Sequence, residues 1–228
     1  MKKTNIVSVV ISAVMMAVLS ACAKKADFVV PSGEPSAWAP CACCNWADQF
    51  PYTPDVKFRM WHDSEYFYIE YMVDEELTKA EQTVRGGFVH MDSCVECFLQ
   101  PDPENDPYYY SIECNAAGYL YLACRTGRED AIDAPLDVNL SVKTESSCGS
   151  EPFGTVALGH PWTLKLSIPT TALFRHKIDT WDGFKCRMNV YKCNQGMERQ
   201  AFLSWAPVHT PKPSFHNPET FYNVEFSK

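Results

Sequence analysis

Hydrophobic and polar residues alternate with a period of two along much of the chain. Residues 56–61 and 66–73 both show this pattern, and they flank the turn-forming sequence His62–Glu65. Side chains of a β-strand point alternately to the two faces of a sheet. The two segments are therefore predicted to form a hairpin with one buried face.

Further short segments have a strand-like pattern. Asn115–Gly118 separates two of them and predicts a second hairpin. Pro169 ends another and is expected to begin a helical turn that extends to Phe174. No long segment has the 3.6-residue period of a helix. The predicted strands after the first hairpin are residues 94–99, 108–114, 119–124, 162–168, 184–190, 202–205 and 222–226. So many short strands joined by polar turns predict an all-β protein, an antiparallel β-sandwich.

The first residues have the pattern of an export signal. Lys2 and Lys3 precede an apolar run over residues 6–19, which is too short to cross a membrane comfortably. The run ends in Leu-Ser-Ala before Cys22, and this resembles the lipobox of bacterial lipoproteins, whose cysteine is acylated. The alternative is an ordinary secretory signal followed by an unmodified cysteine.

These features predict three regions. Residues 1–21 would be a lipoprotein signal peptide, residues 22–40 the lipidated Cys22 and a polar tether, and residues 41–228 the folded domain. The implied location is the bacterial cell envelope, with a lipid anchor in the membrane. Lys24 and Lys25 follow Cys22 in place of an acidic run, so we favour the periplasmic face over the outer surface.

The charge balance argues against polyanionic partners. The chain has 20 Lys and Arg against 28 Asp and Glu, a net charge of −8. Loss of residues 1–21, which contain Lys2 and Lys3 but no acid, takes this value to −10. We therefore expect no nucleic-acid partner and favour a neutral ligand.

Eleven cysteines are the next unusual feature of the composition. Most of those after Cys22 lie in strand-like segments, where a free cysteine behaves as a small apolar residue. The group Cys41-Ala42-Cys43-Cys44 stands apart from them. It lacks the paired spacing of a zinc site. A disulfide to a distant partner, unpaired thiols and, less favoured, a metal site remain the alternatives.

Catalytic signatures are weak. The sequence has no HExxH motif, no G-x-S-x-G motif and no glycine-rich phosphate loop. Asp92, Glu96 and Glu113 could in principle supply a pair of carboxyl groups for glycoside hydrolysis. In an extended strand, however, Asp92 and Glu96 would lie about 13 Å apart. The enzyme question stays open, with O-glycosyl hydrolysis as the reaction to test.

Aromatic residues are numerous, with 13 Phe, 11 Tyr and 6 Trp. Sugar rings have apolar C–H faces, which aromatic rings cover well, while neighbouring polar groups pair with the hydroxyls. Most of these aromatic residues are expected to lie in the core, yet their abundance suits saccharide binding.

Five segments, in order, resemble the family 9-like carbohydrate-binding modules found in association with xylanases. They are residues 45–59, 92–98, 110–118, 187–193 and 203–221, and the resemblance covers about residues 45–226. The resemblance implies a jelly-roll-like β-sandwich that binds saccharides without cleaving them. In that family a sugar end is held between two aromatic rings, next to an acid and other polar groups.

Carried over to this sequence, the implied carbohydrate-binding residues are His90, Glu96, Tyr108, Tyr110, Lys212 and Phe215. Glu96 would be the acid and Phe215 one of the two rings. The other ring normally lies two or three residues before the motif aspartate, Asp92. Here His90 and Val89 stand at these positions, and a histidine stacks less well than a tryptophan.

The resemblance also bears on cofactors and partners. Some members hold structural calcium, and the loop acids Asp63, Asp74 and Asp106 are of the right type for it. The expected ligand is an oligo- or polysaccharide, with a role in carbohydrate catabolism beside a glycosidase partner. The alternatives are a glycoside hydrolase and a protein-interaction module on a sugar-binding scaffold.

Overall fold

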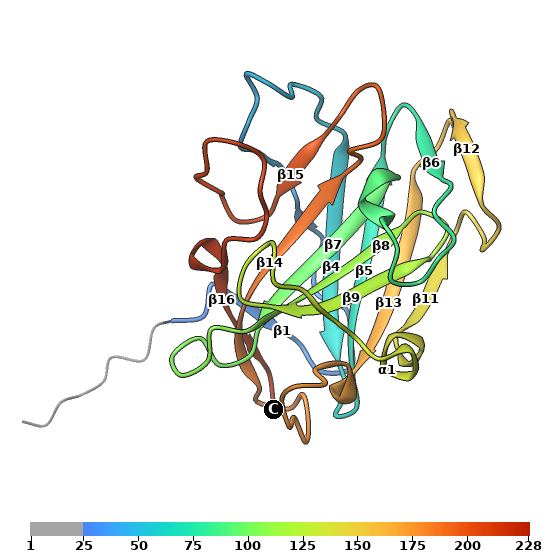
Figure 1. The fold of residues 1–228 in the computed structure, drawn as a ribbon. Helices are drawn as coiled ribbons and strands as arrows, with labels where there is room; N and C mark the ends of the chain where they lie inside the picture. Colours follow the sequence, from blue (N-terminus) through green and yellow to red (C-terminus); the bar gives the residue numbers. More distant parts are fainter. Residues whose placement is uncertain (1–24) are drawn as a thin grey trace, which may run out of the picture.

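Two packed β-sheets form the body of the protein in the computed structural model, which describes residues 25–228 (Figure 1). The fold is therefore the predicted all-β sandwich. The predicted signal peptide and Cys22 lie outside the described residues. No helix among residues 25–228 is long and apolar enough to cross a membrane.

The larger sheet has nine strands and faces the viewer in Figure 1. All of its pairs are antiparallel except β1 with β16. Strand β15 (Phe202–Ser204) pairs with β14 and with β3 (Cys43–Cys44) beside the main path. The path runs through β1 (Phe28–Val30), β16 (Tyr222–Phe226), β14 (Lys185–Cys193), β7 (Cys94–Gln100), β8 (Tyr109–Asn115), β9 (Leu120–Arg125) and β10 (Ile132–Asp133).

The smaller sheet lies behind it and has five antiparallel strands. In order these are β11 (Lys143–Ser146), β13 (Trp162–Pro169), β5 (Tyr66–Asp74), β4 (Asp55–His62) and β2 (Ala39–Pro40). A separate ribbon pairs β6 with β12, and the described helical segments are short. Their bounds are β6 (Thr78–Ala80), β12 (Phe153–Val156), α1 (Leu136–Ser141), η1 (Val89–Met91), η2 (Thr170–Ala172) and η3 (Pro218–Thr220).

The main core lies between the sheets. The predicted hairpin is confirmed as β4 and β5, in which every second residue is buried and faces the larger sheet. Phe58, Phe67 and Ile69 are fully buried there. Burial of each such side chain stabilises the fold by about 1.5–3 kcal/mol.

The outer face of the larger sheet is also covered. Odd-numbered residues of β7, such as Cys97, enter the main core, while Phe98 points to the opposite face. There it joins a second apolar cluster with Trp46, Tyr191 and Phe215, most of which come from loops or neighbouring strands. Because both of its faces are covered, every residue of β7 is buried, and the strand shows no simple alternation.

Two findings refine the predicted regions. Strands β1 and β2 lie before residue 41, within the segment predicted as a tether followed by an edge segment. Strands of two or three residues are too short to leave a periodic pattern. The ten cysteines of the described residues are all free thiols, which supports the unpaired alternative for the group at residues 41–44.

Candidate functional site

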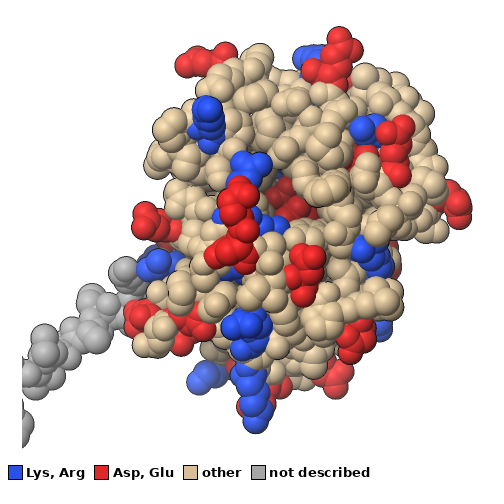
Figure 2. All heavy atoms as spheres, viewed as in Figure 1, with Lys and Arg blue, Asp and Glu red and all other residues tan. Residues whose placement is uncertain are grey.

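A cavity of about 520 Å³ opens on the outer face of the larger sheet. Its floor is formed by β7, β8 and β9, and its walls come from the segments 86–90, 128–133 and 213–216. Figure 2 shows a hollow near the centre of this face, with acidic and basic atoms gathered around it. The cavity therefore brings many polar and charged groups together on this face.

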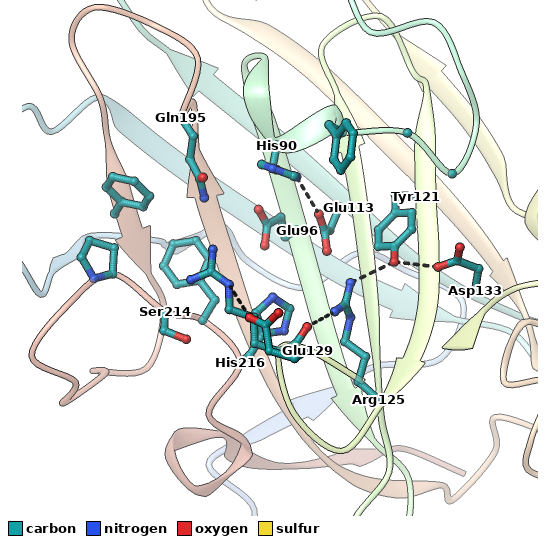
Figure 3. Close-up of a pocket in the computed structure, with 17 residues that line it drawn as sticks. His90, Glu96, Glu113, Tyr121, Arg125, Glu129, Asp133, Gln195, Ser214 and His216 are labelled. Carbon is teal, nitrogen blue, oxygen red and sulfur yellow. Dashed lines mark hydrogen bonds and ion pairs between the residues drawn. The ribbon is translucent and has the colours of Figure 1, made fainter. Parts of the chain in front are cut away.

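Two buried glutamates lie side by side in this cavity. Glu96 on β7 and Glu113 on β8 are directly opposed in the strand register, so their side chains project from the same face. They are 3% and 5% exposed, and both line the cavity (Figure 3). Near them, the His90 Nδ1 atom lies 3.9 Å from Glu113 Oε2.

Burial sets the protonation of both carboxyl groups. It raises the pKa of Glu113 to about 7, against the opposing charge of Arg125. Burial also raises the pKa of Glu96 well above its usual range, with the Cys193 thiol and Glu113 adding to the effect. Burial therefore favours the protonated form of Glu96, and Glu113 is partly ionised near neutral pH. The pair can both donate and accept hydrogen bonds.

Arg125 is a buried cation that the surrounding residues hold in place. Its guanidinium donates to Ser111 Oγ at 3.0 Å, to the Tyr121 hydroxyl at 3.0 Å and to the Arg128 carbonyl at 2.7 Å. Tyr121 in turn donates to Asp133 Oδ1 at 2.8 Å (Figure 3). This network fixes one side of the cavity.

Phe88 gives the cavity an exposed aromatic rim. Its side chain is 72% exposed, and its ring meets His90 edge to face at 5.8 Å. Two glycines precede it: Gly86 has a φ of +81°, and a Cβ on Gly87 would lie 2.8 Å from the Val84 carbonyl oxygen. Only glycine fits this turn without strain. The turn thereby sets the start of η1, from which Phe88 and His90 reach the cavity.

Phe215 provides an aromatic surface inside the cavity. Its ring stacks on Tyr191, with 4.2 Å between centroids and 15° between planes. One face of Phe215 is therefore already occupied, and at most the other is free for a ligand.

The sequence model described as carbohydrate-binding family 9 matches residues 30–226. The chain belongs to this family. No curated protein matches the sequence significantly.

Solved structures agree with this family assignment. A Bacteroides uniformis ATCC 8492 protein, described as a candidate carbohydrate-binding protein, is 35% identical to this chain, with a TM-score of 0.78. That match covers 83% of this chain and 86% of the other. A family 9 module from Caldicellulosiruptor kristjanssonii, solved with glucose, has a TM-score of 0.56 at 11% identity, over 88% of this chain and 95% of that one. A complex of a family 9 module from the same organism with cellotriose has a TM-score of 0.53 at 12% identity, over 88% and 93% of the two chains.

Three of the six residues implied by the family resemblance lie together. His90, Glu96 and Phe215 line the cavity. Lys212 is exposed on the loop before Phe215 and does not line it.

Tyr108 and Tyr110 also lie outside the cavity. Tyr110 points into the main core, where its hydroxyl contacts His176 Nδ1 at 2.8 Å and accepts the Arg175 amide at 2.9 Å. Tyr108 packs against the same core, under the Arg175 guanidinium at 4.5 Å from its ring centroid. Because β8 alternates, Glu113, an odd-numbered residue, faces the cavity and these even-numbered ones do not.

Several cavity residues were not expected as ligand-binding residues. Glu113 stood out only as a possible catalytic acid, while Phe88, Arg125, Tyr121 and Gln195 carried no motif. One signal in the sequence could have found Glu113. Side chains of β8 alternate between the two faces of the sheet, and Glu113 is the residue opposite Glu96. The other cavity residues could not be found from the sequence, because the turn at residues 86–88 and the cavity loops come next to the sheet only when the chain folds.

The acids considered for calcium do not come together. Asp63 accepts the amides of Glu65 and Tyr66 and the Tyr68 hydroxyl, so it holds a turn. Asp106 accepts the Tyr108 amide, and Asp74 is exposed on the other sheet. Within residues 25–228, no group of three or more potential metal-ligating side chains includes any of these three acids.

Proposed function

We propose that this cavity binds a ring of an uncharged oligo- or polysaccharide and does not cleave it. The observation that carries the proposal is the Glu96–Glu113 pair, buried in a cavity that an exposed aromatic ring borders, in a family 9 fold. The family 9 structures solved with glucose and cellotriose support the ligand class.

The cavity residues have separate tasks in this proposal. Phe88 covers the apolar C–H face of the sugar, as aromatic rings do in saccharide sites. Glu113 and Gln195 form hydrogen bonds with hydroxyl groups of the sugar. The positive charge of Arg125 favours the ionised form of Glu113, which accepts such bonds. One oxygen of Glu96 is already occupied, because it accepts the Cys193 thiol at 2.9 Å.

The test is a glycan-array screen of the chain from residue 23, followed by calorimetry with the best ligand. The screen is run with calcium and again with a chelator. We expect Glu113→Gln to weaken the measured affinity at least tenfold, because a hydrogen bond to a charged group contributes about 1.5–3 kcal/mol. Glu70→Gln is the matched control, since Glu70 lies on the outer face of the smaller sheet, paired with Arg59.

A blank array with folded protein would contradict the proposal and favour the protein-interaction alternative. Equal affinities for the wild type and Glu113→Gln would show that the sugar binds elsewhere.

Glycoside hydrolysis is the second candidate, because two carboxyl groups project into one cavity. Retaining glycosidases use two carboxyl groups about 5 Å apart, one of them ionised as the nucleophile. Here burial disfavours the ionised form of Glu113, which would have to be the nucleophile, and the Cys193 thiol already bonds with Glu96, which would have to be the acid. We therefore expect no release of reducing sugar from a polysaccharide panel. Release that disappears in Glu113→Gln and persists in Glu70→Gln would reverse this conclusion.

The cellular setting belongs to the same proposal. Cys22 would carry a lipid that anchors the domain in the bacterial cell envelope, on the periplasmic face. There it would hold saccharides for a glycosidase partner during polysaccharide catabolism. The lipobox-like sequence before Cys22 and the family membership support this setting.

A further inference from the structure

Two buried thiols lie against Glu96, one of the residues that line the cavity. Cys94 and Glu96 are two residues apart on β7, so their side chains point to the same face. Cys193 on β14 is directly opposed to Cys94 in the strand register. The Sγ atoms of Cys94 and Cys193 and a carboxylate oxygen of Glu96 all lie within 4.8 Å of one another.

The three groups already interact. The Cys193 thiol donates to Glu96 Oε1 at 2.9 Å, and it also lies 3.6 Å from the His90 carbonyl oxygen. The neighbouring Lys192 does not neutralise this cluster, because its ammonium pairs with Glu75 at 2.9 Å, and both side chains are fully buried. The cluster therefore has three potential anionic ligands, and neither of the nearby cations, Lys192 and Arg125, forms an ion pair with Glu96.

We propose that Cys94, Glu96 and Cys193 form a binding site for a thiophilic divalent ion of the zinc type. Thiolate sulfur binds Zn²⁺ at about 2.3 Å and carboxylate oxygen at about 2.0–2.2 Å, in tetrahedral geometry. Two such ligands on one ion are about 3.5–3.8 Å apart. The distance from Cys193 Sγ to Glu96 Oε1 is 2.9 Å and the other two separations are at most 4.8 Å, so shifts of about 1 Å in the side chains suffice.

The cavity supplies the remaining coordination position. Cys94 and Cys193 are fully buried, whereas Glu96 lines the cavity. An ion held by all three has protein on the strand side and space for a water or a hydroxyl oxygen on the cavity side. Three protein ligands with one open position is the arrangement of zinc sites that hold a water or a substrate, as opposed to closed structural ones.

Binding exchanges protons for the ion. Each thiol releases one proton to solvent as its sulfur forms a bond to the metal, and the Glu96 carboxyl group releases its proton as one of its oxygens binds as a carboxylate. The two thiolates and the carboxylate together give the occupied site a net charge of −1. No oxidation or reduction takes place.

The experiment titrates Co²⁺ into the reduced, metal-free chain from residue 23, which contains every described element. We expect one ion per chain, a sulfur-to-cobalt charge-transfer band and the intense visible bands of a four-coordinate ion. Zn²⁺ should remove these bands, because it binds such sites more tightly than Co²⁺. Cys94→Ser and Cys193→Ser should each lose the charge-transfer intensity, and Glu96→Gln should weaken Co²⁺ binding at least tenfold.

Cys97→Ser is the matched control, because Cys97 is equally buried on β7 but faces the main core. It should keep the full cobalt spectrum. Three results would overturn the site: no cobalt–sulfur band in the wild type, a band that survives in Cys94→Ser and Cys193→Ser, or a Cys94–Cys193 disulfide in the exported protein. The wild-type result holds even if a variant fails to fold, and the readout does not depend on sugar binding.

Discussion

Phe88 shows how much a single exposed side chain contributes to the proposed site. Phe88→Ala is expected to weaken saccharide affinity about tenfold, because it removes an aromatic surface with a typical contribution of about 1–1.5 kcal/mol. The fold should be unaffected, since the ring is 72% exposed. Calorimetry against the array ligand measures the change. Trp38→Ala is the control, because Trp38 is exposed on the side of the smaller sheet and should leave affinity intact.

His216 lends the protein a pH dependence of stability. Burial lowers the pKa of His216 to about 3, and the charges of Arg125, Arg128 and His90 add to this, with Asp130 opposing them. In the unfolded chain the pKa of histidine is about 6.5. The unfolded state therefore takes up the proton first, and the stability contributed by neutral His216 is complete above pH 6.5 and is lost as the pH falls toward 3.

His216→Gln should flatten this part of the pH profile. Urea unfolding of both proteins between pH 4 and pH 7 gives the comparison. A constant difference in unfolding free energy across that range would contradict the assignment. Glu113 acts in the opposite direction: its folded pKa of about 7 means that its contribution falls as the pH rises. Glu113 is present in both the wild type and His216→Gln, so its contribution cancels in the difference between their unfolding free energies.

At the scale of the elements, the two faces of β8 have different tasks. Tyr110→Phe should leave saccharide affinity unchanged, because the ring lies in the main core. It should lower the unfolding free energy by about 1 kcal/mol, since it removes the hydroxyl that bonds with His176 and Arg175. Urea unfolding and calorimetry on one preparation separate the effects. A loss of affinity at full stability would place Tyr110 in the site after all.

The same elements show what the sequence could predict. The alternation at residues 56–61 and 66–73 identified β4 and β5, because one face of that hairpin is buried and the other is not. β7 and β8 were located by their apolar character, but both faces are buried, so the pattern did not tell which face was which. A shift of one residue moves a side chain to the other face. The family resemblance alone implied Tyr108 and Tyr110 beside the ligand, and the pattern of β8 could not show that they pack against the main core.

Other parts of the site left no local signal. Phe88 reaches the cavity through a glycine turn, and Arg125 is buried at the end of β9 through contacts with Ser111 and Tyr121. Such contacts join residues that are distant in the sequence. Glu96 and Phe215 were predicted from the family resemblance, because the family's known site already shows which distant segments come together.

At the scale of the whole molecule, the proposed anchor makes a simple prediction. Cys22→Ser removes the only sulfur to which the lipid would be attached. The protein should then move from the membrane fraction to the soluble fraction, which blotting of both fractions measures. Lys24→Ser is the control and should leave the protein in the membrane. A Cys22→Ser protein that stays in the membrane would show that something other than the lipid holds it there.

The pairing of β1 with β16 limits how far the domain could stand from such an anchor. Strand β1 begins at Phe28, only six residues after Cys22. A fully extended chain spans at most about 3.3–3.6 Å per residue, so this linker would span at most about 20 Å. A tether reaching to residue 40 would be about three times as long. The shorter linker would keep the domain within a thin layer next to the bilayer. The domain would therefore bind glycans that reach the membrane surface and not those farther away.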